Sequence, residues 1–193
     1  MTLRLFLAIP VPDDVAARLV LLQRNLPGAS WRPPETFHLT LRFFHEVDEA
    51  LARDLDHELG QIIAAPFEMR LKGAGSFGGR EPSAVWAGAE APPTLARIAA
   101  GCESAARRVG LAPESRTFRP HVTLAYLHGT TDTQVATYQQ AFGAFATDLF
   151  WVDHFVMYSS HATKHGSRYV EQAVYPLIGQ LTGPLGGPLT GPV

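Results

Sequence analysis

Two short segments decide how this chain folds: Phe37-His38-Leu39-Thr40-Leu41 and Pro120-His121-Val122-Thr123-Leu124. Each is a His-x-Thr unit inside an alternating apolar run, and the two histidines lie 83 positions apart. Side chains at i and i+2 of an extended strand point to the same face. Each segment therefore predicts a strand that presents an imidazole and a hydroxyl side by side and turns its large apolar side chains to the other face.

These side chains have the chemistry that cleavage of a phosphate ester requires. One imidazole can accept a proton while the other donates one, and two hydroxyls can hold the non-bridging oxygens. An isolated His-x-Thr in a strand is more often structural, but two in matching contexts favour a site. We predict catalytic roles for His38 and His121, substrate-binding roles for Thr40 and Thr123, and a phosphodiesterase that needs no metal or cofactor. The residues alone do not assign which histidine is the acid.

The composition is that of a globular protein with a sizeable core. Of the 193 residues, 46% are apolar and 18% are charged, and the formal net charge of −2 does not favour a protein that coats long nucleic acid. The single cysteine, Cys102, excludes an internal disulfide and fits a reducing compartment. Neither a signal peptide nor a membrane span is expected. We predict a cytoplasmic monomer.

The order of predicted elements repeats along the chain. The first half reads as a strand over 3–9, a helix from Pro12-Asp13 to Pro27-Gly28, a strand over 37–43, a helix from about Asp48, a strand over 67–72 and a strand over 84–89. The second half reads as a helix after Pro92-Pro93, a strand over 118–127, a helix capped by Thr131 and strands over 150–158 and 169–175.

This repetition suggests an internal duplication. We predict an α+β fold with two pseudo-symmetric lobes of mostly antiparallel sheet plus helices, each lobe giving one motif to a central cleft; a single mixed sheet is also compatible with the pattern. The domain is expected to span 1–181. Residues 182–193, rich in Gly and Pro, are expected to form a flexible tail.

The motifs and their flanks resemble the 2H phosphoesterase superfamily, and within it the bacterial RNA 2′,3′-cyclic phosphodiesterases, also called 2′-5′ RNA ligases. The segments that carry the resemblance are Arg4–Ile9, Phe37–Phe43, Val85–Gly88, Phe118–Ala125 and Tyr158–Ser160. The resemblance implies a bilobal fold and metal-independent hydrolysis of a 2′,3′-cyclic phosphate at an RNA end to a 2′-phosphomonoester. It also implies that His121 activates water and that His38 protonates the departing 3′ oxygen.

Three further residues are candidates for substrate contact. Arg42 shares the expected face of His38 and is placed to meet a phosphate, although a solvated strand residue fits the pattern equally well. Phe77, in a glycine-rich loop expected over 73–82, and Tyr126 are candidates to stack on a base. No metal site is expected, because the chain has no His-Glu-x-x-His, no paired cysteines and no clustered aspartates.

Two other functions remain compatible with these residues. Another 2H phosphodiesterase activity, on 2′-5′ oligonucleotides or small cyclic nucleotides, would use the same four side chains with different loops. A non-catalytic module that binds RNA ends is disfavoured, because binding alone does not need two proton-transfer groups.

Overall fold

The computed structural model describes residues 2–163 and 166–179, so the expected tail over 182–193 lies outside the described residues. The described part forms four α-helices, one short 3-10 helix and nine strands. In chain order they are β1 (Thr2–Pro10), α1 (Asp13–Val20), β2 (Ala29–Trp31), η1 (Pro34–Thr36), β3 (His38–Asp48), α2 (Glu49–Leu59), β4 (Phe67–Phe77), β5 (Ala84–Glu90), α3 (Pro93–Arg108), β6 (His121–Leu127), α4 (Asp132–Phe142), β7 (Phe150–Val152), β8 (His154–Thr163) and β9 (Gly166–Pro176).

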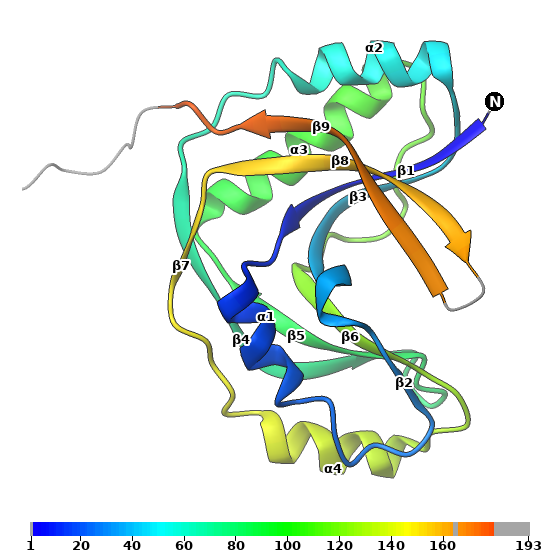
Figure 1. Cartoon of the computed structure of the whole chain (residues 1–193), viewed down its shortest axis with the longest axis vertical. Helices are drawn as coiled ribbons and strands as arrows, with labels where there is room; N and C mark the ends of the chain where they lie inside the picture. The colour runs from blue at the N-terminus through cyan, green and yellow to red at the C-terminus, as the bar shows by residue number, and fades with distance from the viewer. Residues whose placement is uncertain (1, 164–165, 180–193) are drawn as a thin grey trace, which may run out of the picture.

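All nine strands belong to one strongly curved antiparallel sheet, which confirms the α+β class. The strand order is β7-β4-β5-β6-β3-β1-β8-β9. Strand β2 lies outside this order and pairs with residues 125–127 of β6. The two strands that carry the His-x-Thr motifs, β3 and β6, are neighbours at the centre of this order. In Figure 1, α2 and α3 lie with β1, β3, β8 and β9 in the upper part, whereas α1 and α4 lie with β4, β5 and β6 in the lower part.

The two lobes are not the two halves of the chain. The upper lobe joins β1 and β3 to β8 and β9, and the lower lobe joins β4 and β5 to β6 and β7. Each lobe therefore takes strands from both halves, with its motif strand innermost and three further strands outward. The expected pseudo-symmetry is present in this order, and the two lobes are interleaved in sequence rather than consecutive.

Local sequence signals set the ends of two helices. The Asp48 carboxylate accepts a hydrogen bond of 2.9 Å from the Leu51 amide and so caps α2. Thr131, predicted as a cap, forms a capping box with Gln134 at the start of α4. Cys102 is fully buried on α3, within the continuous core.

Several expected boundaries differ from the structure. The strand expected over 118–127 begins at His121, and the strand expected over 150–158 is the two strands β7 and β8. Helix α1 ends at Val20, yet Leu22 and Leu26 are still buried, because the chain beyond the helix continues to follow the core surface. The stretch expected as a glycine-rich loop is strand β4 up to Phe77. Gly75 is required there by a close approach: a Cβ at this position would overlap the ring of Trp86 on β5.

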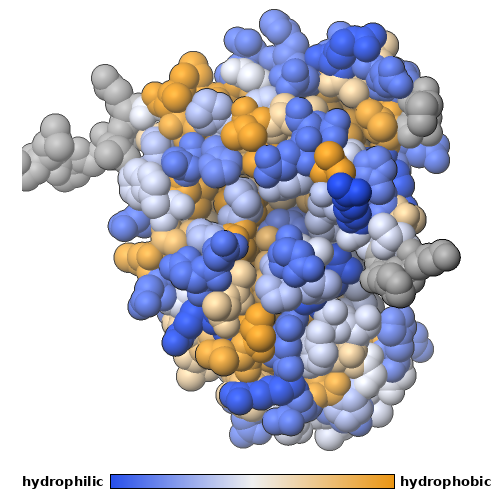
Figure 2. All heavy atoms as spheres, in the orientation of Figure 1, coloured by the Kyte–Doolittle hydropathy of each residue, from blue (hydrophilic) through white to orange (hydrophobic). Residues whose placement is uncertain are grey.

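The molecular surface is mixed in character. On the face shown in Figure 2, hydrophobic residues lie scattered among hydrophilic ones, and the upper edge, over α2, is mainly hydrophilic. Within 2–163 and 166–179, no helix has the length and apolar character needed to cross a membrane.

Candidate active site

The two His-x-Thr motifs lie side by side in opposite directions. Leu39 of β3 pairs with Val122 of β6 in an antiparallel register, and both side chains are buried in the core. Residues one position away from this pair point to the other face of the sheet, and there the histidine of each motif lies level with the threonine of the other. The level pairs are His38 with Thr123 and Thr40 with His121. The structure thus brings all four predicted side chains together on one face.

Each motif is followed by a one-residue β-bulge. On β3 the bulge is at Leu41, between the pairs that Thr40 and Arg42 form with β1. On β6 it is at Leu124, between the pairs that Thr123 and Ala125 form with β5. A bulge places two residues opposite one and reverses the alternation beyond it. As a result, the residues that follow the bulges face opposite to where strict alternation would place them.

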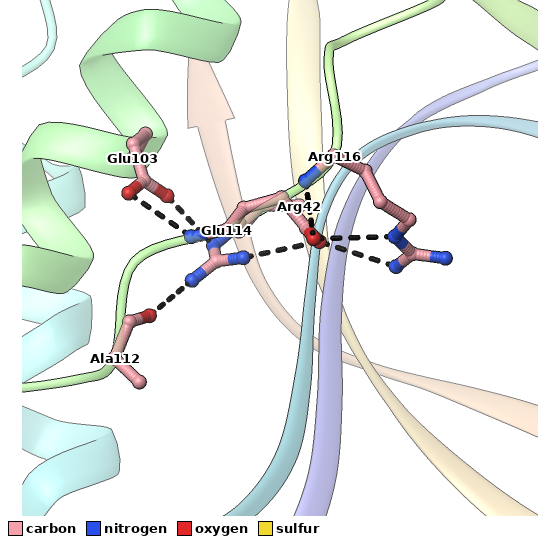
Figure 3. A network of polar contacts seen from close by, with 5 residues as sticks. All are labelled: Arg42, Glu103, Ala112, Glu114 and Arg116. Carbon is pink, nitrogen blue, oxygen red and sulfur yellow. Dashed lines mark hydrogen bonds and ion pairs between the residues drawn. The ribbon is translucent and has the colours of Figure 1, made fainter.

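The bulge on β3 turns Arg42 away from His38, so the expectation that they share a face is wrong. The guanidinium lies among acidic and carbonyl groups of α3 and the segment after it, as Figure 3 shows. Its Nε is 3.0 Å from Glu103 Oε2, its Nη1 is 3.2 Å from Glu114 Oε2, and its Nη2 donates to the Ala112 carbonyl at 2.6 Å. Arg42 therefore ties β3 to the segment that leads into the second motif. Arg116 hydrogen-bonds to Glu114 and lowers the pKa of that carboxyl to about 2.

The bulge on β6 has the opposite effect on Tyr126. Ala125 is buried, whereas the Tyr126 side chain is 50% exposed and lies on the face of the motif histidines. Its ring lies under the guanidinium of Arg32, with 5.7 Å from the guanidinium carbon to the ring centroid. Its expected contact with a base stays a prediction.

Both histidines are oriented in the same way. The Nδ1 of His38 lies 2.7 Å from the Thr36 carbonyl oxygen, and the Nδ1 of His121 lies 2.6 Å from the Arg119 carbonyl oxygen. A carbonyl oxygen only accepts, so each Nδ1 carries the hydrogen. In the neutral ring the lone pair is then on Nε2, which is the nitrogen left to exchange protons with a substrate.

Aromatic rings enclose each imidazole. Phe77 packs edge-on against His121 with 4.9 Å between ring centroids, and Trp86 lies 5.8 Å from the same ring. In the upper lobe, Tyr169 packs edge-on against His38 with 5.2 Å between ring centroids, and the Phe6 ring centroid lies 4.8 Å from that of His38. Each lobe thus surrounds its histidine with rings from other strands of the same lobe. Phe77 forms part of this enclosure, and its expected contact with a base stays a prediction.

This enclosure changes the proton affinity of the histidines. Burial lowers the pKa of His38 from 6.5 to about 4; the hydrogen bond to the Thr36 carbonyl opposes this, and the charges of Arg32 and His121 add to the lowering. Burial also lowers the pKa of His121, against the hydrogen bond to the Arg119 carbonyl, which raises it. Both rings are therefore mainly neutral near pH 7 before an anion binds.

Arg32, Phe6 and Tyr169 face this site but were not among the residues predicted from the sequence. Phe6 lies in a run that was correctly predicted as a strand, and its alternation could have placed it beside a motif histidine. Arg32 stands in a Trp-Arg-Pro-Pro stretch with no pattern that marks it, and Tyr169 comes from a strand distant in sequence. Among the described residues, no group of three or more His, Cys, Asp or Glu side chains is placed to hold a metal ion.

Comparison with known proteins places this geometry in a family. A family model described as the 2′-5′ RNA ligase superfamily matches residues 11–164, which include both motifs. The chain belongs to this superfamily.

Two curated relatives carry the same name. An RNA 2′,3′-cyclic phosphodiesterase from Thermus thermophilus is 37% identical over 136 residues, which cover 64% of this chain and 68% of that protein. One from Aeropyrum pernix is 38% identical over 97 residues, which span 49% of this chain and about half of that protein, 55%. Among solved structures, E. coli LigT complexed with 3′-AMP superposes with a TM-score of 0.77 at 25% identity, covering 92% of this chain and 99% of that one.

Proposed function

We propose that the chain is an enzyme that hydrolyses 2′,3′-cyclic phosphate ends of RNA to 2′-phosphomonoesters without a metal. The observation that carries this proposal is the crossed register of the two motifs, which sets two imidazoles and two hydroxyls on one face of the sheet. The names of the Thermus and Aeropyrum relatives, RNA 2′,3′-cyclic phosphodiesterase, support the substrate class. A reaction that needs one base and one acid finds both in this arrangement.

The orientation of the two rings makes Nε2 the atom of each histidine that exchanges a proton with the substrate or water. His121 Nε2 accepts a proton from water as the water oxygen bonds to phosphorus. The bond between phosphorus and the 3′ oxygen breaks, and His38 Nε2 donates a proton to that oxygen, which leaves a 3′ hydroxyl and a 2′-phosphomonoester. The assignment of His121 as base and His38 as acid rests on the family resemblance.

The acid role requires His38 to carry a proton that its surroundings disfavour in the free protein. A bound phosphodiester anion supplies the missing negative charge next to the ring and raises the pKa of an imidazole beside it. Thr40 and Thr123 donate hydrogen bonds to the non-bridging oxygens, where charge develops in the transition state. Substrate binding thus favours the protonated form of His38, which can then donate its proton to the departing 3′ oxygen.

The same site can also use a hydroxyl in place of water, in a ligation that is the reverse of 2′-5′ linkage cleavage. If the 5′ hydroxyl of a second RNA takes the place of water, attack on the cyclic phosphate joins the two chains through a 2′-5′ linkage. The superfamily description names this ligation. We expect hydrolysis to dominate, because water is present in large excess over RNA ends.

The test uses an oligoribonucleotide that ends in a 2′,3′-cyclic phosphate, with excess EDTA. We expect a 2′-phosphate product from the wild type, and a loss of at least about 10²-fold in turnover for both His38→Ala and His121→Ala. His57→Ala, at an exposed position on α2, serves as the control and should keep full activity. Near-normal turnover in either motif variant would disprove the site.

The same assay with other substrates tests the substrate specificity. Turnover only of 2′-5′ oligonucleotides or of small cyclic nucleotides would keep the site and change the substrate. Binding of the RNA end without turnover of any substrate would favour the non-catalytic module. Activity that EDTA abolishes and a divalent ion restores would contradict a metal-independent reaction.

A further inference from the structure

Arg32 follows β2 at the rim of the motif face, and its backbone is fixed on both sides. Its amide donates to the Leu124 carbonyl at 2.8 Å, and its own carbonyl accepts a hydrogen bond of 2.6 Å from Gln23 Nε2. Leu124 is the bulge residue that directly follows the second motif. The main chain at Arg32 is thus held against the same strand that presents His121 and Thr123.

The Arg32 side chain is directed toward the His38 side of the site by two tyrosines. Its Nη2 donates to the Tyr169 hydroxyl at 3.1 Å, and its guanidinium lies over the Tyr126 ring. The Tyr169 ring is the one that packs edge-on against His38. A guanidinium has several N–H donors, so these contacts leave donors that a ligand can use.

The charge of Arg32 is not neutralised by the residues around it. No carboxylate within 2–163 or 166–179 forms an ion pair with it, whereas Arg42, on the opposite face, lies between Glu103 and Glu114. Its positive charge reaches the site, since it contributes to lowering the pKa of His38. A half-buried cation that is held in place and has no acidic partner is suited to bind an anion.

We propose that Arg32 is an anion subsite on the His38 side of the cleft, and that its guanidinium binds a phosphate oxygen of the nucleotide end. Tyr169 acts as a positioning residue, because its hydroxyl fixes the guanidinium, and Tyr126 supports the same group from below. This inference rests on the proposed function for the identity of the ligand. The phosphate it binds is either the reacting cyclic phosphate or the phosphate that joins the last two nucleotides.

Two substrates separate these phosphates. A nucleoside 2′,3′-cyclic phosphate has only the reacting phosphate, whereas a dinucleotide with a terminal cyclic phosphate has the joining phosphate as well. Arg32→Met removes the proposed charge-assisted hydrogen bond to the phosphate, so it should lower kcat/KM about 10- to 100-fold. An equal loss on both substrates assigns the reacting phosphate, and a loss only on the dinucleotide assigns the joining phosphate. No loss on either substrate overturns the proposal.

Matched variants exclude a merely structural effect. Arg24→Met removes another guanidinium that lies over an aromatic ring, at 5.5 Å from Phe142, away from both histidines, and should leave kcat/KM unchanged. Arg32→Lys keeps the charge and should recover part of the loss. Tyr169→Phe should give a smaller loss that appears mainly in KM. An equal fall in kcat/KM for Arg24→Met and Arg32→Met would overturn the assignment.

A binding measurement separates failure of this proposal from failure of the proposed function. Inorganic phosphate is titrated into wild type, Arg32→Met and Arg24→Met by calorimetry at one ionic strength. We expect about 10-fold weaker binding for Arg32→Met alone. That result with no turnover by the wild type would keep the subsite and reject the reaction. Turnover by the wild type with equal phosphate affinity and equal kcat/KM in all three proteins would keep the reaction and reject the subsite.

Discussion

The two candidate catalytic histidines are oriented by neutral groups. Each Nδ1 donates to the backbone carbonyl two residues earlier, at Thr36 and at Arg119. A carbonyl fixes the ring and its tautomer, but it stabilises the imidazolium less than a carboxylate would. Burial therefore dominates, and the pKa of both His38 and His121 falls below the ordinary value. The sequence predicted both residues from their spacing, but their proton affinity depends on rings contributed by distant strands.

The lowered pKa of His38 predicts a loss of stability in weak acid. As the pH falls below 6.5, the unfolded chain binds a proton that folded His38 does not bind until about pH 4. The free energy of unfolding should therefore decrease by about 3 kcal/mol between these values from His38 alone. Urea unfolding of wild type and His38→Gln at several pH values measures the difference, and the variant should lose most of this slope. An identical slope in both proteins would contradict the lowered pKa, and His57→Gln, at an exposed position, is the control.

At the scale of single elements, alternation predicted strands well and bulges poorly. Both bulge residues, Leu41 and Leu124, are apolar and buried, so they satisfy an uninterrupted alternating pattern as well as a bulged one. The extra residue becomes visible only in the pairing with β1 and β5. This is why Arg42 was expected beside His38 and lies on the opposite face. The segment around Gly75 was predicted as a loop for a related reason. The glycine is required by the Trp86 ring of another strand, and this contact is not visible in the local sequence.

The position of Arg42 predicts a structural role. Its side chain is 8% exposed and links β3 to Glu103 of α3 and to Glu114. Arg42→Met leaves Glu103 without its cation and Glu114 with Arg116 alone, which should cost about 1–3 kcal/mol. In a chain of this length we expect the Tm to fall by roughly 3–10 °C. Thermal unfolding measures it, and Arg53→Met, at an exposed position on α2, should have no effect.

A second variant tests whether charge is the cause. Adding Glu103→Gln to Arg42→Met removes the carboxylate that has lost its cation, since Glu114 keeps its ion pair with Arg116, and should recover part of the lost Tm. A double variant that is less stable than Arg42→Met by the full effect of Glu103→Gln alone would show that the two residues do not interact.

At the scale of the whole molecule, the repeated order of elements predicted two related lobes but not how the chain builds them. The upper lobe closes only when β8 from the second half pairs with β1 from the first, and the lower lobe closes only when β6 inserts beside β5. Local patterns describe each strand and its faces, but the choice of partner depends on contacts distant in sequence. Each motif strand is the innermost strand of its lobe, so the two motif strands meet at the centre of the sheet.

This interleaving predicts that neither half of the chain folds alone. Of the strand pairs among the described residues, a separation at residue 91 leaves β1–β3 and β4–β5 in the first half and only β8–β9 in the second, because β6 and β7 pair there with strands of the first half. Isolated strand pairs are at most marginally stable in water. Helix α2 contacts β3 within the first fragment, but α3, which packs on both β3 and α2, lies in the second. We expect fragments 1–91 and 92–193 to lack a cooperative thermal transition by circular dichroism, and the intact chain to unfold in one transition. Mixing the fragments should restore structure and turnover, since the missing partners are then present. A cooperative transition in either fragment alone would show that one half contains a complete lobe, and the interleaved arrangement of the sheet would then be wrong.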